Sequence, residues 1–298
     1  MSMTEPNGWL ILDKPLGLGS TQAVGAVKRA LREAGYGKAK VGHGGTLDPL
    51  ASGVLPVAIG EATKLAGRML DSDKIYDFTV SFGTETDTLD LEGAVNATSE
   101  IRPTRAEVES VLPKFTGPIE QAPPAYSAIK IDGKRAYDLA RAGEAVEIKA
   151  RAVTIHALSI LDSDADRVTL TAQVSKGTYI RSLARDIAYA LGTVGHVTML
   201  RRTKAGPFTL KDAISLDILH EAATARAIEQ LMLPLTAGLD DIPALSVTPE
   251  QATALRQGRI LSGDPRIQGL MLALEGETPV ALVESLGPDI RVVRGFNL

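Results

Sequence analysis

Cysteine is absent from the 298-residue chain, so no disulfide, thiolate metal site or cysteine nucleophile can contribute to its function. The chain also lacks any run approaching the roughly 18 apolar residues that a membrane-spanning helix needs. The first residues carry no basic region and only a short apolar run, Trp9 to Leu12, which does not fit a signal peptide. These absences predict a soluble, cytoplasmic protein.

Aromatic residues make up only 4% of the chain and include one Trp, which speaks against a sugar-binding cleft lined by stacked rings. Four His residues are present, but none has the spacing of a zinc-binding HExxH motif. We therefore expect neither a metal ion nor a cofactor.

The composition is that of an ordinary globular protein, with 44% hydrophobic and 23% charged residues. At a typical length of about 150 residues per domain, the chain is long enough for two domains. No internal repeat or low-complexity segment is visible.

Charge is distributed unevenly along the chain, although the net charge is only −4. The stretch 173–204 holds six Lys or Arg and one Asp, a balance of +5. Residues 205–298 hold seven Lys or Arg and twelve Asp or Glu, a balance of −5. A basic face that binds nucleic acid is therefore compatible with the acidic total, and a merely solvated basic surface is the alternative.

Hydrophobic periodicity predicts strands and helices that mix without a regular βαβ rhythm, which favours an α+β domain with a largely antiparallel sheet. Thr104 and Glu107 form a capping-box pattern for a helix through Leu112. The other expected helices are 20–33, 61–70, 136–142, 182–190 and 222–233. The expected strands are 9–12, 54–59, 75–82, 152–161, 168–174 and 197–200.

A linker is predicted at 235–243, followed by a short helix at 249–257 and three β-rich runs near 270–274, 279–284 and 290–293. This pattern divides the chain into a main domain, 1–236, with an insertion at about 123–150, and a small β-rich domain, 243–298.

The densest cluster of glycines lies between Gly42 and Pro56, around Asp48-Pro49. The proline biases Asp48 toward an extended conformation and away from helix. A carboxylate on such a loop is either a turn residue or a functional acid, and the loop by itself leaves both interpretations open.

This run, GHGGTLDPLASGVLP, resembles the catalytic motif of the TruB family of tRNA pseudouridine synthases, and the resemblance continues into GEATK. Five further segments resemble that family's motifs in the same order along the chain. They are DSDKIY (71–76), Gly83 with TDT (86–88), QAPPAYSAIK (121–130), KGTYIRSL (176–183) and LRRT (200–203).

The resemblance implies site-specific isomerisation of a uridine to pseudouridine in the T-stem-loop of tRNA, at position 55, by base flipping. It assigns the catalytic carboxylate to Asp48, the cation beside it to Arg181, and stacking on the flipped uracil to Tyr76. It implies that Tyr179 and Leu200 form the pocket walls and that His43 fills the space the base leaves. Whether Asp48 attacks the ribose C1′, adds to the base or assists a glycal route stays open.

The implied partner is tRNA, with no membrane and no obligatory protein partner, and the chain is expected to act as a monomer. The insertion resembles an RNA-gripping segment, and the C-terminal unit resembles a PUA-type RNA-binding module. The cations expected to contact phosphates are Lys64, Lys130, Arg141, Lys176 and Arg202.

Three other functions are alternatives to this one. Ser127 to Lys130 fits the S-x-x-K of serine acyl-enzymes, but S-D-N and K-T-G partners are missing. A glycoside hydrolase could use Asp48 with a second carboxylate such as Asp90. A non-catalytic RNA-binding or tRNA-folding protein would explain the basic stretches but not the set of Asp48, Tyr76 and Arg181.

Overall fold

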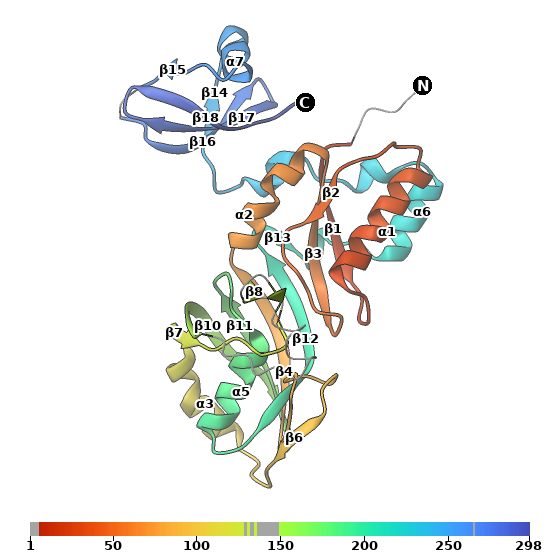
Figure 1. The fold of residues 1–298 in the computed structure, drawn as a ribbon, viewed down its shortest axis with the longest axis vertical. Coiled ribbons are helices and arrows are strands. Elements are labelled where there is room, and N and C mark those ends of the chain that lie inside the picture. The colour runs from red at the N-terminus through yellow and green to blue at the C-terminus, as the bar shows by residue number, and fades with distance from the viewer. Residues whose placement is uncertain (1–5, 128–129, 132–133, 136–148, 265) are drawn as a thin grey trace.

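The structure is a computed structural model that describes residues 6–127, 130–131, 134–135, 149–264 and 266–298. Figure 1 shows a long twisted sheet running through the larger part of the molecule. Helices α1 and α6 flank one half of that sheet, and α3 and α5 flank the other. A second, smaller sheet lies at one end of the molecule (Figure 1).

The larger sheet has nine strands in the order β1-β3-β12-β4-β11-β10-β7, with β2 paired to β3 and β13 paired to β12. All these pairs are antiparallel except β3 with β12, which is parallel. The expected α+β fold with a largely antiparallel sheet is therefore confirmed. The strands are β1 (Gly8–Lys14), β2 (Val41–His43), β3 (Ala51–Ile59), β4 (Lys74–Phe82), β7 (Gly117–Gln121), β10 (Arg151–Ser163), β11 (Arg167–Val174), β12 (Gly195–Ala205) and β13 (Phe208–Thr209).

The helices bury one face each, because their apolar residues recur every three or four positions. The longest described helix, α1, has 14 residues, and no helix in the described part of the chain is long and apolar enough to cross a membrane. The helices of the larger body are α1 (Ser20–Glu33), α2 (Ala66–Asp71), α3 (Arg105–Val111), α5 (Ile180–Ala190) and α6 (Leu216–Thr224). Short 3₁₀ turns are η1 (Gly60–Leu65), η2 (Leu112–Phe115), η3 (Leu210–Asp212), η4 (Ile228–Leu231) and η5 (Leu235–Gly238).

The two halves of the sheet have separate hydrophobic cores. One core packs α1 and α6 against β1 and β3, and the other packs α3 and α5 against β4 and β11. Tyr76 of β4 and Leu200 of β12 contact both cores. Since both residues were expected at the reacting base, the boundary between the two halves is where a site should be sought.

Two short hairpins interrupt the helices and strands of the second half. One, β5 (Thr84–Thr86) with β6 (Val95–Thr98), encloses an acidic loop that contains Asp87, Asp90 and Glu92. The other, β8 (Lys130–Ile131) with β9 (Lys134–Arg135), lies in the insertion. The helix expected at 136–142 and Arg141 lie outside the described residues.

Some predicted element boundaries were wrong, for identifiable reasons. The helix expected at 222–233 begins at Leu216, because the Ser215 hydroxyl accepts a hydrogen bond from the amide of Ile218. It ends at Thr224, and Arg226 then takes a positive φ of 55°, which breaks helical continuity before η4. The helix expected at 61–70 starts with the 3₁₀ turn η1. The capping box at Thr104 and Glu107 is confirmed.

The smaller sheet has five strands in the order β14-β16-β17-β18-β15, and helix α7 packs against it. Its own core contains Leu255, Met271, Val280, Val283 and Ile290. The elements are β14 (Ala244–Ser246), α7 (Pro249–Arg256), β15 (Leu261–Ser262), β16 (Gly269–Glu275), β17 (Thr278–Leu286) and β18 (Asp289–Gly295).

The segment expected to be a linker is packed rather than free. Leu235 and Leu239 are buried in a third core with Trp9, and the Trp9 indole N–H donates to the carbonyl of Leu235 at 3.1 Å. The same core includes Leu282 and Phe296 of the C-terminal sheet. This sheet is therefore seated on the larger body through apolar contacts.

Close packing at this junction gives a stability prediction. A Cβ on Gly238 would lie 2.8 Å from Cζ2 of Trp9, a rigid buried ring with no exposed surface. We expect Gly238→Ala to lower the free energy of unfolding by about 1–3 kcal/mol, because overpacking forces the ring to move. Urea unfolding followed by Trp9 fluorescence measures the change.

Gly37→Ala is the matched control, because a Cβ there meets nothing within 4 Å and the position is exposed. Equal stability of Gly238→Ala and Gly37→Ala would show that η5 is not held against Trp9.

Candidate active site

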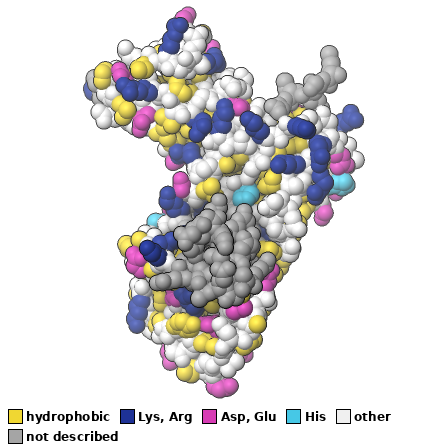
Figure 2. Space-filling view, viewed as in Figure 1, with side chains coloured by type: hydrophobic (Ala, Val, Ile, Leu, Met, Phe, Trp, Pro, Cys, Tyr) yellow, Lys and Arg dark blue, Asp and Glu magenta, His cyan; other side chains and the backbone are white. Residues whose placement is uncertain are grey.

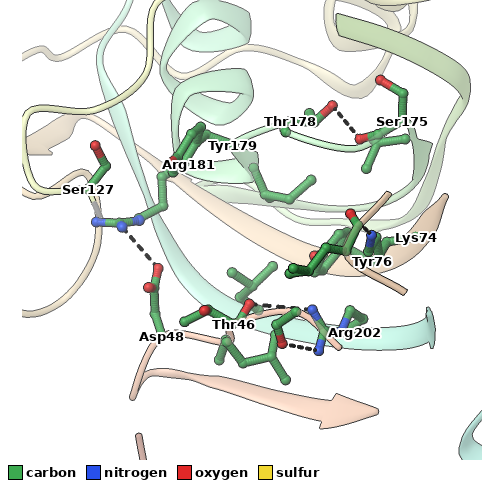
Figure 3. A pocket seen from close by; sticks show the side chains of 18 of the residues that line it. Thr46, Asp48, Lys74, Tyr76, Ser127, Ser175, Thr178, Tyr179, Arg181 and Arg202 are labelled. Atoms are coloured by element: carbon green, nitrogen blue, oxygen red, sulfur yellow. Dashed lines mark hydrogen bonds and ion pairs between the residues drawn. The ribbon is translucent and has the colours of Figure 1, made fainter. Parts of the chain in front are cut away.

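A cavity of about 340 Å³ opens between the two halves of the larger sheet (Figure 3). One side is formed by the loop 45–48 before β3, and the other by the turn 175–181 that leads into α5. Tyr76 of β4 and Leu200 of β12 complete it, so the cavity lies at the boundary of the two cores. Its volume falls in the range of small-molecule sites, which is about 300–1,000 Å³.

The loop that carries Asp48 is fixed by its backbone. The hydroxyl of Ser20, the first residue of α1, donates to the Leu47 carbonyl at 2.9 Å and accepts from the Leu47 amide at 2.8 Å. Gly19 is the N-cap of α1, so the Ser20 hydroxyl does not cap the helix and holds this loop. The Asp48 side chain nevertheless keeps 46% of its surface exposed, so its carboxylate is presented to the cavity.

Arg181 lies opposite Asp48 and joins two carboxylates. Its Nη2 is 2.9 Å from Oδ2 of Asp48, and its Nη1 is 3.1 Å from Oδ2 of Asp90 (Figure 3 shows the first pair). The same two nitrogens donate to the carbonyls of Tyr126 and Thr88. Arg181 is only 8% exposed, so its charge depends on these contacts.

Asp90 is in turn held in place from its own loop. The Thr88 hydroxyl and the Glu92 amide both donate to its Oδ1, at 2.5 and 3.0 Å. The sequence suggested Asp90 only as a second carboxylate for glycoside hydrolysis. Among the described residues lining the 340 Å³ cavity, however, Asp48 is the single carboxylate, so the two-carboxylate arrangement of that chemistry is not found there.

Tyr179 is positioned by Gln121, the first residue of the segment 121–130 quoted above, and by Arg151, neither of which was given a role from the sequence. The fully buried Gln121 accepts from the Tyr179 amide at 2.8 Å and donates to its carbonyl at 3.1 Å. The Arg151 guanidinium lies 4.9 Å from the centre of the Tyr179 ring and donates to the Gly177 carbonyl. Gln121 lies in β7 and Arg151 in β10, and each contacts a turn more than 20 residues further along the chain. Local sequence spacing therefore does not predict these contacts.

Arg202 was expected to contact phosphate, and the structure does not support that expectation. The side chain is 1% exposed and donates to the carbonyls of Val54 at 2.7 Å, Gly45 at 3.1 Å and Thr46 at 3.4 Å. Alternation along β12 turns Arg202 inward and its neighbour Arg201 outward, where Arg201 pairs with Asp13 at 2.7 Å. Arg202 therefore holds the loop that precedes Asp48.

Two buried lysines lie beneath the same loop. Lys14 donates to the carbonyls of Pro15 and Leu18, and burial lowers its pKa to about 8 although Asp48 acts in the opposite direction. Lys74 donates to the carbonyls of Met69, Leu70 and Ser72. Burial, followed by the nearby charge of Arg202, lowers the pKa of Lys74 to about 8.

His43 lies outside the 340 Å³ cavity, in a larger hollow of about 850 Å³ on the other side of Asp48. The two hollows share Asp48 and Arg181. Burial, and then the charge of Arg202, lowers the pKa of His43, so its imidazole is neutral at neutral pH. Its Nδ1 is buried and has no hydrogen-bond partner among the described residues.

Lys64 and Lys176, the other expected phosphate contacts whose side chains the structure describes, do not line either hollow. Lys176 is exposed and pairs with Asp71 at 3.0 Å, whereas Lys64 pairs with Glu61 and donates to the Gly295 carbonyl of the C-terminal sheet. Of Lys130 the structure describes the backbone, in β8. Within the described ranges, no group of His, Asp and Glu is arranged to hold a metal ion.

Comparison with known proteins agrees with this geometry. Residues 32–180 match the N-terminal domain model of the TruB family of pseudouridylate synthases, and residues 181–240 match the C-terminal domain model of tRNA pseudouridylate synthase B. The chain is 64% identical to the tRNA pseudouridine synthase B of Novosphingobium aromaticivorans over 297 residues, 98% of both chains. It is also 64% identical to that of Zymomonas mobilis over 291 residues, 98% of this chain and 96% of the relative.

Among solved structures, the chain resembles one in the crystal structure of a Cbf5-Nop10-Gar1 complex, with a TM-score of 0.74 and 25% identity. The match covers 97% of this chain and 85% of the other. The fold and the site thus define a pseudouridine synthase. The chain belongs to the TruB family.

The lowered pKa of Lys74 makes stability depend on pH. Between about pH 8 and 10.5 the unfolded chain binds the Lys74 proton and the folded chain does not, so unfolding becomes harder as pH rises. Relative to Lys74→Met, the wild type should gain about 1–2 kcal/mol of stability between pH 8 and 10. Urea unfolding at both pH values measures this difference.

Lys114→Met removes an exposed lysine and controls for the loss of one surface charge. A stability difference between wild type and Lys74→Met that stays constant from pH 8 to 10 would contradict the prediction.

Proposed function

We propose that this protein converts a uridine of tRNA to pseudouridine, and that the uridine lies in the T-stem-loop, at position 55. The observation that carries the proposal is the open carboxylate of Asp48, held by the buried Arg181 at the edge of a cavity lined by Tyr76. Family membership supports the reaction, and the names of the relatives support tRNA as the substrate.

The reaction breaks the bond between the ribose C1′ and N1 of uracil and forms a bond between C1′ and C5. The hydrogen on C5 leaves to solvent, and N1 takes up a proton, so nothing is oxidised or reduced and no cofactor is needed. Arg181 contacts Oδ2 of Asp48, which leaves Oδ1 to face the substrate. This oxygen is the group we assign to the ribose or the base.

The two hollows on either side of Asp48 can accommodate a nucleotide whose base has been flipped out of the stacked RNA. A single flipped uridine would occupy the 340 Å³ cavity, where Tyr76 supplies a ring face for stacking worth about 1–3 kcal/mol. The rest of the RNA loop would occupy the 850 Å³ hollow beside His43. Extruding a base costs a few kcal/mol, and a neutral imidazole can fill the space it leaves.

We also propose a division of the chain into two domains. We assign 1–236 to catalysis, because the nine-stranded sheet and the described site lie within it, and 243–298 to a PUA-like RNA-binding module. A monomer without an obligatory protein partner is the assembly that we propose. The cytoplasm is the proposed location because the substrate is tRNA.

Asp48→Asn tests the catalytic assignment. We expect it to abolish release of tritium from an unmodified tRNA transcript labelled at uridine C5, because the amide is neutral and a poor nucleophile or base. RNA binding, measured by filter retention, should remain within about threefold of wild type, since one side chain of a large interface changes.

Asp162→Asn is the control, because Asp162 is exposed and lies outside both hollows. Retained tritium release by Asp48→Asn would refute the role of this carboxylate. No release by the wild type, with tRNA binding intact, would favour an RNA-binding or tRNA-folding protein.

Arg181→Lys tests the geometry of the ion pair. One ammonium cannot reach Asp48, Asp90 and the two carbonyls together, so the Asp48 carboxylate should lose its fixed orientation. We expect kcat to fall by about 100-fold, the effect of displacing a catalytic group by about 1 Å, with less change in KM. A kcat within threefold of wild type would show that planar guanidinium geometry is not required.

A further inference from the structure

A group of exposed cations lies at the C-terminal end of α1 and in the loop that leads to β2. The segment 28–40 holds five Lys or Arg and one Glu, a balance of +4. All five cations are exposed, and none forms an ion pair within the described part of the chain. We call this group the α1 basic surface: Lys28, Arg29, Arg32, Lys38 and Lys40.

The stretch 173–204 also has an excess of positive charge, but most of its cations are not available to a ligand. Five of its six cations are buried or paired inside the protein. Arg181 and Arg202 are buried, and the paired ones are Lys176 with Asp71, Arg185 with Asp186 and Arg201 with Asp13. Of these two basic stretches, 28–40 is therefore the one whose cations are exposed and without an ion pair among the described residues.

The α1 basic surface lies on two segments, α1 and the loop before β2, that each lead to the cleft. Ser20, at the start of α1, lines the hollow beside Asp48, and Lys28 and Arg32 follow about 12–18 Å further along the helix. In the loop, Lys40 leads directly into β2, whose last residue, His43, lines the same hollow. Figure 2 shows Lys and Arg side chains gathered over the α1 region of the molecule.

The chemistry of this surface favours a polyanion over an apolar partner. Every exposed residue between 20 and 40 is Thr, Gln, Lys, Arg, Glu or Gly, so no apolar side chain is offered to a membrane or to the centre of a protein interface. The chain as a whole carries a charge of −4, which repels RNA at long range. A dense, unpaired set of cations beside the cleft counteracts that repulsion where the RNA has to approach.

We propose that the α1 basic surface binds the phosphates of the RNA stem that continues from the reacting loop. The loop enters the hollow beside Asp48, and the stem then runs along α1, where the five cations contact its backbone without reading its sequence. This proposal rests on the proposed function, because it takes the same RNA to be the substrate.

Loss of these cations should change the salt dependence of RNA binding, because each neutralised phosphate releases counterions. Each phosphate neutralised contributes about 0.9 to the slope of log K against log salt for a duplex. If each of three cations contacts one phosphate, their removal lowers this slope by about 2–3. Removing them also weakens binding by about 10-fold or more at moderate salt, and KM should rise by more than kcat falls.

The test uses the full-length triple variant Lys28→Gln, Arg29→Gln and Arg32→Gln, because Gln keeps the helix propensity of the replaced residues. Filter binding to an unmodified tRNA transcript across a series of KCl concentrations gives the slope, and tritium release gives kcat and KM. The matched control is Arg105→Gln, Lys114→Gln and Arg167→Gln, which removes three exposed cations from the half of the sheet that carries α3.

A reduced slope and a raised KM in the α1 variant, with the control variant like wild type, would support the proposal. An equal loss in both variants would overturn it, because net charge alone would then explain the binding. An unchanged slope in the α1 variant would also overturn it.

Binding to a short RNA hairpin distinguishes stem contacts from loop contacts, because the hairpin has the reacting loop but only a few base pairs of stem. The α1 variant should bind this hairpin nearly as well as wild type does, and an equal loss on hairpin and tRNA would contradict binding to the stem. Wild type without tritium release would instead refute the proposed function, while the salt slope would still report on the α1 basic surface.

Discussion

The guanidinium of Arg181 is the contact on which the site depends. It connects the loop of Asp48 before β3, the loop of Thr88 and Asp90 after β5, and the start of the insertion at Tyr126. Removing one partner of a buried ion pair commonly costs about 3–5 kcal/mol, because the other charge stays buried. The positions of these three segments are therefore interdependent, and a shift in the insertion changes the support of the carboxylate.

The other buried cations near the cavity have a different kind of hydrogen-bond partner from Arg181. Lys14, Lys74 and Arg202 are satisfied by backbone carbonyls and not by carboxylates. Arg202 holds the loop before Asp48, Lys14 holds the turn after β1 and Lys74 holds the end of α2, and none of them adds a second acid. As a result, the described cavity combines one carboxylate with an excess of positive charge, which suits a ligand that carries phosphate.

Much of the fold could be predicted from local patterns, because alternation and helical spacing reflect burial directly. The capping box at Thr104 and the largely antiparallel sheet are examples. Asp48 was found because a motif surrounds it, and Arg181 lies opposite it as the motif implied. Arg151 was missed, and the contact of Gln121 with Tyr179 could not be foreseen, because both residues act on partners distant in sequence.

Arg202 shows the other limit of sequence reasoning. A run of two arginines suggests a phosphate contact, but alternation along β12 places one inside and one outside, and only the inner environment decides its role. The net charge of +5 in the stretch 173–204 likewise does not predict a binding surface, because five of its six cations are buried or paired within the protein. Counting charges along the chain does not show which of them are already paired.

The place of β12 in the sheet has a consequence for how the protein is made. β12 lies between β3 and β4, so the two halves of the larger sheet pair with each other only through it. Asp48 precedes β3, and Arg181 lies in the helix just before β12. The two halves therefore cannot pair before β12 has been synthesised, and the core that packs α1 also needs Leu219, Ala223 and Ile228, which follow β12 in the chain. The ion pair of Asp48 with Arg181 thus joins two segments that come together only when most of the larger body has been made.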